Sequence, residues 1–366
     1  MRFSRTVLII AFAWLGAHIA AGQPSEHATL TGTVVDIETG LPLPNAHVFI
    51  AASMMGTATN DDGQFHLKHV PLGTHRLYVS MIGFEPVAKD TLLRNAGEYT
   101  FSFELVPAIL ELDGVTISAK RDARWKRRLR RFEQFFLGES SNADHAKILN
   151  PEVLNFEGGW GKLVATASAP LIIENRALGY RIQYFLKEFI RSGSTIKYDG
   201  EPFYEELEPE NSKEAERWAE NRRRAYYGSF RHYLLALLGG RLKEEGFLTF
   251  RRFSLDRLYS TRNRFGIDPT RLLAEGPTAN EKLLRFSGYL EVLYINELET
   301  EAFLSWMGRS PWGHQNNQRS WVKLTDGPTL IDHTGEVVDP YGVTVYGYFA
   351  FERIADEVPK EYRPEQ

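Results

Sequence analysis

Cysteine is absent from the 366 residues of this chain, and its absence removes several kinds of chemistry at once. Disulfide bonds, thiolate metal sites and cysteine nucleophiles are excluded, and so is a lipid anchor on an N-terminal cysteine. The protein must therefore be held together by its packed core. Hydrophobic residues make up 43% of the sequence, which is ample for such a core, and the length predicts two or three domains.

The sequence also lacks a strong charge of either sign, and its formal net charge is −4. This mild acidity argues against nucleic acid as a partner. The longest apolar run is Val7–Ile19, which follows Arg2 and Arg5 and precedes the small residues Ala20–Gly22. That order predicts a secretory signal peptide over residues 1–22, and the run is too short to span a bilayer. We expect an exported protein without a transmembrane segment after cleavage.

Short strand-like segments fill residues 28–118 and are separated by turn-forming clusters such as Asn60–Gly63. Apolar side chains alternate with polar ones along them, for example at Leu77, Val79 and Met81. About seven strands at regular spacing, joined by Gly, Pro and Asp turns, predict an antiparallel β-sandwich.

Three stretches of this region carry a family pattern: GTVVDIETGLPLPNAHVFI, GTATNDDGQFHLKHVPLGTHRLYVSMIGFEP and LDGVTISAKR. Pro42 and Pro44 fix φ in the first loop, and Gly63 supplies a positive φ after Asp62. The pattern resembles the carboxypeptidase regulatory-like (transthyretin-like) domain, which TonB-dependent receptors also carry. The resemblance implies a transthyretin/prealbumin-like fold over residues 24–118, where the domain is accessory and not catalytic.

A strongly basic segment follows the sandwich, with eight basic residues among the twelve of Lys120–Arg131. Aromatic and aliphatic residues recur there at helical spacing, which predicts an amphipathic helix within 119–144. They are Trp125, Leu129, Phe132 and Phe136. Two interpretations remain open. The helix docks its apolar stripe on the next domain, which we favour, or it lies on an anionic membrane surface or an acidic polymer.

The remaining residues combine strand-like alternation with one long helical pattern from about Ser212 to Leu238. Asn211 or Ser212 can cap that helix and Gly239–Gly240 can end it. We predict an α+β domain with a mostly antiparallel sheet and one long helix. The expected parts are a signal peptide (1–22), a sandwich (24–118), a basic linker helix (119–144), an α+β domain (145–358) and a tail (359–366).

The whole chain also resembles a group of exported proteins of Gram-negative bacteria that join such a sandwich to a second domain. The stretches that carry this resemblance are ILNPEVLNFE, APLIIENRALGYRIQYFL and RRRAYYGSFRHYLLALLGGRLKEEGF. It supports the architecture and a periplasmic or outer-membrane-associated location, and it implies no mechanism.

Motifs that would bring catalysis are incomplete. His333–Glu336 matches the first half of a zinc carboxypeptidase motif, but no histidine follows it. Asn60–Gly63 lacks the carboxylates of a calcium loop and favours a hairpin turn. Gly158–Lys162, GGWGK, lacks the first glycine and the final Ser or Thr of a phosphate loop. Paired-carboxylate catalysis stays open, because 47 acidic residues offer many pairs.

One segment, Phe303–Trp321, is a candidate surface site because tryptophans and amides gather there. Exposed Trp rings beside amides are suited to stacking on sugars and bonding their hydroxyls. The candidate residues are Trp306, Trp312, His314, Asn316, Asn317 and Trp321. The alternative, which we favour, is that Trp306 and Trp321 pack inward.

The sequence therefore favours a non-enzymatic binding or scaffolding protein of the cell envelope. A metal, a cofactor and catalytic residues are not expected. An envelope protein or a glycan is the expected kind of partner, and membrane-surface contact would run through Lys120–Arg131. The alternative is an envelope hydrolase of peptide or glycan with its site in the second domain.

Overall fold

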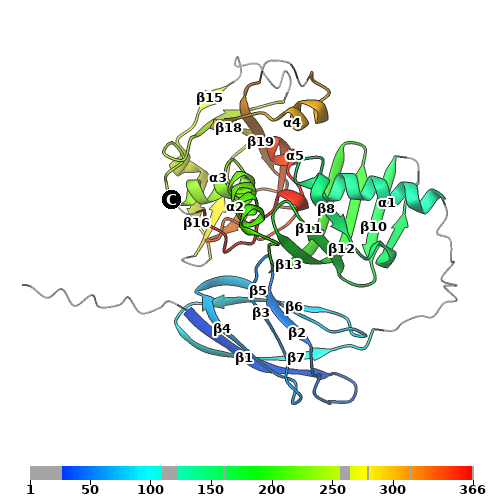
Figure 1. Cartoon of the computed structure of the whole chain (residues 1–366). Coiled ribbons are helices and arrows are strands. Elements are labelled where there is room, and N and C mark those ends of the chain that lie inside the picture. Colours follow the sequence, from blue (N-terminus) through cyan, green and yellow to red (C-terminus); the bar gives the residue numbers. More distant parts are fainter. Residues whose placement is uncertain are drawn as a thin grey trace, which may run out of the picture.

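The computed structural model describes residues 27–108, 123–159, 161–255, 264–277, 280–310, 312 and 315–364. The predicted signal peptide and the first residues of the basic segment lie outside these ranges. Figure 1 shows a β-sandwich below a larger part that is rich in sheets, with helix α1 at its side. The helices of the described residues are too short or too polar to cross a membrane.

The N-terminal part is a sandwich of seven strands, as predicted, but its first and last strands pair in parallel, so the expectation of a wholly antiparallel sandwich is wrong at that pair. One sheet has the order β4-β1-β7 and the other the order β3-β2-β5-β6. The strands are β1 (His27–Asp36), β2 (His47–Ile50), β3 (Gly56–Ala58), β4 (Gln64–Pro71), β5 (Gly73–Ser80), β6 (Val87–Leu93) and β7 (Gly97–Leu105). Alternate residues such as Leu30, Val34, Leu77 and Val79 are fully buried between the sheets, so the period of two in the sequence sets the core.

The Asn60 turn confirms the predicted hairpin chemistry. The Asn60 Oδ1 accepts hydrogen bonds from the backbone N–H groups of Asp62 (3.1 Å) and Gln64 (2.8 Å). Gly63 has a φ of +69°, and a Cβ there would lie 2.6 Å from the carbonyl oxygen of Val34. The carboxamide closes the turn and only glycine fits beside it.

The second part is built around a long hairpin of β12 (Tyr180–Ser192) and β13 (Thr195–Glu206). β11 (Leu171–Asn175) pairs with the first half of β12, and β10 (Lys162–Ala167) pairs with the second half. The edges of this sheet are β8 (Ala146–Ile148) and β9 (Leu154–Glu157). Short 3-10 helices precede them at Ala143–His145 and Pro151–Val153.

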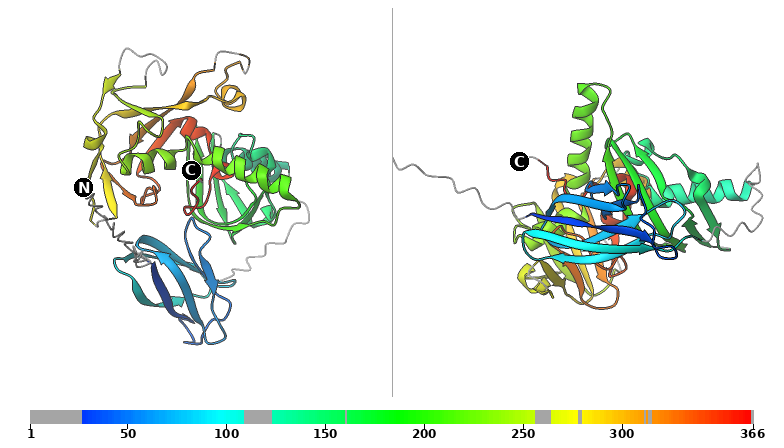
Figure 2. Two further views of the ribbon diagram at one scale, coloured as in Figure 1. Left: turned by 60° about the vertical axis from the view of Figure 1, so that its left-hand side comes forward. Right: turned by 90° about the horizontal axis from the view of Figure 1, so that it is seen from below.

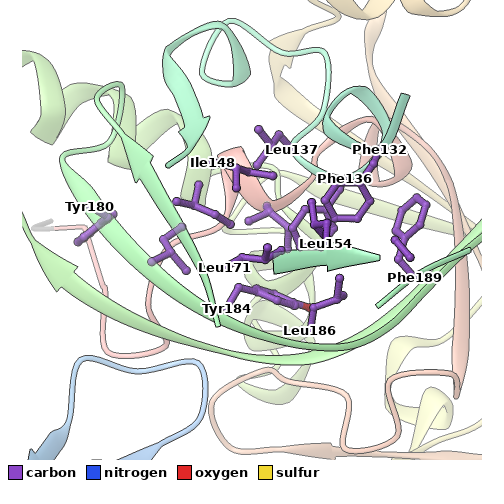
Figure 3. Packing of buried hydrophobic residues seen from close by; sticks show 14 of the residues in the cluster. Phe132, Phe136, Leu137, Ile148, Leu154, Leu171, Tyr180, Tyr184, Leu186 and Phe189 are labelled. Carbon is purple, nitrogen blue, oxygen red and sulfur yellow. The ribbon is translucent and has the colours of Figure 1, made fainter. Parts of the chain in front are cut away.

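Helix α1 (Ala123–Phe136) covers this sheet with its aromatic stripe. Phe132 and Phe136 are fully buried and pack edge-to-face on Phe189 and Tyr184 (Figure 3). Leu129 packs against the same core from a partly buried position. The apolar side of the basic helix is thus docked on the second part of the chain, as the favoured interpretation has it.

The prediction of one long helix over 212–238 is wrong. The chain forms α2 (Ser212–Tyr226) and α3 (Phe230–Leu238), separated by Tyr227, Gly228 and Ser229. Gly228 has a φ of +78°, which a right-handed helix cannot contain, and a Cβ there would lie 2.4 Å from Gln318 Oε1. Ser229 then caps α3 by accepting from the His232 N–H, and Asn211 caps α2 as expected.

Two further sheets complete the second part, and their pairings are all antiparallel, as predicted. One has the order β15-β14-β18-β19-β21 and the other the order β16-β17-β20. The strands are β14 (Phe247–Arg252), β15 (Phe265–Gly266), β16 (Leu273–Glu275), β17 (Glu281–Leu284), β18 (Tyr289–Leu298), β19 (Asn317–Leu324), β20 (Thr329–Asp332) and β21 (Val343–Gly347). The helices are α4 (Glu301–Trp306), α5 (Tyr348–Phe351) and the 3-10 turns Pro269–Leu272 and Ile354–Asp356.

The sandwich docks on the outer face of the β12–β13 hairpin through a buried aromatic cluster. Phe49 and Tyr78 of the sandwich meet Phe185 and Phe203 of the hairpin, with ring centroids 5.0 to 5.1 Å apart across the contact. Arg76 reinforces the contact by an ion pair with Glu201 at 2.8 Å. Such buried aromatic clusters are typical of stable interfaces and not of loosely tethered domains.

Main-chain hydrogen bonds tie three distant segments together at the same place. The Ala52 N–H donates to the Pro202 carbonyl at 2.7 Å, and the Tyr204 N–H donates to the Ser53 carbonyl at 2.9 Å. The Lys360 N–H donates to the Ala52 carbonyl at 2.9 Å. Figure 2 shows the end of the chain, in red, reaching the sandwich beside β13. The division into domains at 118, 144 and 358 stays a prediction.

Substitutions at two glycines test the interface between the sandwich and the second part of the chain. Gly73 and Gly97 have nearly the same backbone, with φ of +140° and +146°, but only at Gly73 would a Cβ meet a neighbour, 2.2 Å from His333 Cε1. We expect Gly73→Ala to lower the free energy of unfolding by about 1–3 kcal/mol more than Gly97→Ala, because it overpacks the interface. Urea denaturation measures both. Equal losses would show that backbone strain and not the contact with His333 sets the cost.

Candidate functional site

A cavity of about 970 Å³ opens where the sandwich, the hairpin and the last residues of the chain meet. Ala52 and Arg76 line it from the sandwich, Tyr204 from β13, and Arg231 from α3. Its walls come from segments as far apart as Ala51 and Lys360, so docking of the sandwich completes the cavity. This is the volume of a pocket for a sizeable small molecule.

Eight acidic residues line the cavity, and four of them stand between residues 336 and 357: Glu336, Glu352, Asp356 and Glu357. Burial raises the pKa of Asp356 to about 6, although Ser140 and Asn142 donate hydrogen bonds to it at 2.7 and 3.0 Å. Burial raises the pKa of Glu357 to about 7, and the nearby Glu336 raises it further. Burial also raises the pKa of Glu352 well above its ordinary value. Part of this cluster is therefore protonated near neutral pH.

Positive groups stand beside these carboxyls but are largely engaged with the backbone. The Arg231 guanidinium donates to the carbonyls of Thr334 (3.1 Å), Pro359 (3.3 Å) and Lys360, and lies 3.7 Å from Glu336. Arg231 thus holds the last segment of the chain against α3. Lys360 is buried, and burial lowers the pKa of its ammonium group.

Tyrosine hydroxyls complete the polar lining. Tyr184, Tyr198 and Tyr204 line the cavity, and burial raises the pKa of all three, so they stay neutral donors and acceptors. Neutral carboxyls and phenols can both donate and accept hydrogen bonds. The arrangement suits an uncharged ligand with many hydroxyl groups better than a strongly charged one.

No group of three or more His, Asp and Glu side chains is placed to hold a metal ion in the described part of the chain. The first and last residues of the half-motif, His333 and Glu336, also lie in different surroundings. The His333 ring faces His75 of the sandwich, with centroids 6.1 Å apart, whereas Glu336 lines the cavity beside Arg231. His333 therefore packs against the sandwich, and Glu336 forms part of the cavity wall.

The structure places the described candidate surface residues in different surroundings. Trp306 and Trp321 line the cavity, with exposed fractions of 37% and 1%, whereas Trp312 is 87% exposed and lies apart from it. Asn317 Nδ2 donates to the Ile295 carbonyl at 2.9 Å, which fixes a strand end. The backbone carbonyl of Asn316 accepts from Glu299, and His314 lies outside the described residues. Binding by these six residues stays a prediction.

Sequence reasoning missed the carboxyl cluster. Glu352, Asp356 and Glu357 stand in a short segment with no helical or strand period, where charges normally face solvent. One signal was present: the apolar residues Ile354 and Ala355 between them, which are fully buried. A segment anchored in this way brings its neighbouring carboxyls into the interior with it.

Residues 30–117 match the model of the CarboxypepD_reg-like domain, so this part of the chain is such a domain. It is a regulatory and not a catalytic domain, and the match does not extend over the larger part of the chain. No curated protein matches the chain.

Solved structures with a similar fold include the transthyretin-like 5-hydroxyisourate hydrolase of Klebsiella pneumoniae, at 18% identity and a TM-score of 0.19, covering 22% of this chain and 90% of that one. A putative carbohydrate binding protein of Bacteroides uniformis has 13% identity and a TM-score of 0.19, covering 43% and 60%. Catechol 1,2-dioxygenase of Acinetobacter sp. ADP1 has 14% identity and a TM-score of 0.20, covering 24% and 55%. The chain thus spans less than two thirds of the last two, and none of these similarities carries an argument about activity.

The carboxyl cluster makes stability depend on pH in a definite direction. Glu357 binds its proton more tightly when folded, because its pKa rises from 4.5 to about 7. The stability contributed by that proton is fully present below pH 4.5 and is lost as the pH rises through about 7. We expect Glu357→Gln to raise the free energy of unfolding at pH 8 by ~2 kcal/mol, with cavity water screening part of the shift.

Urea denaturation at pH 5 and pH 8 measures this difference, and Glu244→Gln, at an exposed carboxyl, is the control. The gain should appear at pH 8 and shrink at pH 5 for Glu357→Gln alone. A gain that is the same at both pH values would contradict a raised pKa.

Proposed function

We propose that this protein is a non-enzymatic binding protein of the cell envelope, whose ligand occupies the cavity between the CarboxypepD_reg-like domain and the second part of the chain. The observation that carries the proposal is the cavity of about 970 Å³ with walls from both parts. A docked accessory domain that contributes Ala52 and Arg76 to the walls has a role in binding, whereas a tethered one would not.

The chemistry of the walls favours a short glycan as the ligand. Carboxyls with raised pKa, buried tyrosine hydroxyls and two arginines that are already engaged, Arg76 with Glu201 and Arg231 with the backbone, offer hydrogen bonds with part of the charge neutralised. Trp306 adds a partly exposed aromatic face at the cavity wall, on which a sugar ring can stack. A volume of this size accommodates a few sugar units.

A second candidate function is hydrolysis of a glycosidic bond. The observation that favours it is Glu357, whose pKa of about 7 suits a general acid, close to Glu336, whose charge contributes to that shift. Two carboxyls in a water-accessible cavity can divide the roles of acid and base or nucleophile. The CarboxypepD_reg-like domain supports the binding function more directly, since such a domain is regulatory.

Two tryptophan variants separate cavity binding from binding at the surface loop. We expect Trp306→Ala to weaken the binding of a glycan found by array screening by roughly tenfold, because it removes a stacking face from the cavity. Trp312→Ala, at the exposed ring, should leave the affinity within about twofold. Isothermal titration gives the affinities.

Trp306 also packs on Phe303 and Phe351, so thermal unfolding of each variant must accompany the titration. Loss of binding with Trp312→Ala and not with Trp306→Ala would move the site to the surface loop. If no glycan binds, the proposed ligand class is wrong.

Hydrolysis is tested on the same glycans by the release of reducing ends. Under the binding proposal the unchanged protein returns each glycan intact after prolonged incubation, at pH 5 and at pH 7. If reducing ends appear and Glu357→Gln abolishes them while glycan binding persists, the protein is a hydrolase.

A further inference from the structure

A groove of about 450 Å³ lies between α1 and the loop that joins β9 to β10. Four arginines of α1 line one side, namely Arg124, Arg127, Arg128 and Arg131. Three glycines of the loop, Gly158, Gly159 and Gly161, line the other side. These described residues are all distinct from those that line the larger cavity, so the groove is a separate feature.

The arginines converge because of their spacing. Positions 124, 127, 128 and 131 are separated by three and four residues, which places them on one face of a helix. The helix cannot turn this face elsewhere, since Phe132 and Phe136 are locked in the core. Arg128 also fixes the loop opposite, because its guanidinium donates to the carbonyls of Phe156 (2.8 Å) and Gly158 (2.5 Å).

This positive charge has no acidic partner among the described residues. α1 holds six basic residues and a single acidic one, Glu133, and none of the ion pairs within 4 Å in the described part of the chain involves the four arginines. Like charges three and four residues apart destabilise a helix, so the arrangement works against folding unless something else neutralises it.

Helix α2 of the same protein also carries exposed arginines, but there each one is paired with a glutamate. Its exposed arginines are paired with glutamates of the preceding turn: Arg217 with Glu214 at 2.9 Å, and Arg223 and Arg224 with Glu220 at 2.8 and 2.9 Å. A solvated arginine face in this chain is thus neutralised internally. The uncompensated face of α1 is therefore a specific property of that helix.

The glycine loop makes the groove open to a ligand. At Gly159 and Gly161 a Cβ would have no atom within 4 Å apart from those of the chain neighbours, so the described surroundings leave room for a ligand beside these two glycines. Guanidinium forks match phosphate oxygens in pairs, and a bare backbone allows those oxygens to approach closely.

We propose that this groove binds a phosphate group, carried by a small molecule or by a lipid headgroup. A phosphate carries up to two charges and three acceptor oxygens. It can therefore pair with several arginines at once, whereas a single carboxylate cannot. The groove volume exceeds that of one phosphate, so the molecule that bears it has room. Insertion of α1 into a bilayer is not part of the proposal, because its apolar side is buried.

The test compares two triple variants that remove the same charge. Arg124→Gln/Arg127→Gln/Arg131→Gln empties the groove of charge and spares Arg128, which holds the loop. Arg217→Gln/Arg223→Gln/Arg224→Gln does the same on α2 and is the matched control. Titration with inorganic diphosphate should show affinity reduced by roughly tenfold or more for the first and by about twofold or less for the second.

A third variant leaves every charge in place. Gly159→Leu adds a bulky side chain at the groove wall, and Gly159 has neither a positive φ nor a contact within 4 Å beyond its chain neighbours, so the loop should keep its fold. Diphosphate binding should fall in this variant as well, with an unchanged thermal midpoint. Retained affinity here would mean that the arginines act as a diffuse surface charge and would overturn the groove.

Vesicles distinguish the two sources of phosphate. Co-sedimentation is measured with phosphatidylglycerol in phosphatidylcholine and with phosphatidylcholine alone. Diphosphate binding without vesicle binding assigns a small molecule, and vesicle binding that the α1 triple variant abolishes assigns a lipid headgroup. Equal losses in both triple variants, or no binding of either probe by the unchanged protein, would overturn the proposal.

Discussion

The structure depends on one constraint: the β12–β13 hairpin carries large buried aromatic side chains on both of its faces. Side chains alternate along each strand, so Phe185 and Phe203 point to one side while Tyr184 and Tyr204 point to the other. A sheet of this kind is stable only when both faces are covered. α1 packs on the face that carries Tyr184, and the sandwich covers the aromatic patch of Phe185 and Phe203 on the other face. The CarboxypepD_reg-like domain is thereby a structural partner of the rest of the chain.

The cavity is a consequence of that packing. Main-chain bonds from Ala52 to Pro202 and from Lys360 to Ala52 hold three segments at one point, and the cavity opens beside that point. The polar groups at this place lose part of their water. Their carboxyls respond by holding their protons, as Glu352 and Glu357 show, and the pKa shifts follow from the docking.

Local patterns predict the sandwich, the antiparallel sheets and the docked basic helix, because each depends on a period of two or on helical spacing. The prediction of one long helix is wrong at Gly228. The apolar pattern continues through this position, but contact with Gln318 leaves no room for a side chain there. The cavity could not be predicted at all. It joins residues near 52, 204 and 357, and nothing in the sequence around any of them indicates the other two.

Helix α1 connects the two proposed sites. Arg131 lines the anion groove, and Phe135, one turn later, lines the cavity, while Phe132 and Phe136 between and beside them are fixed in the core. The helix is therefore a rigid element with one end of its surface in each site. A ligand in the groove that displaced α1 would have to disturb the buried aromatic stripe, which is costly. The buried aromatic stripe therefore opposes any displacement of α1 by a ligand in the groove.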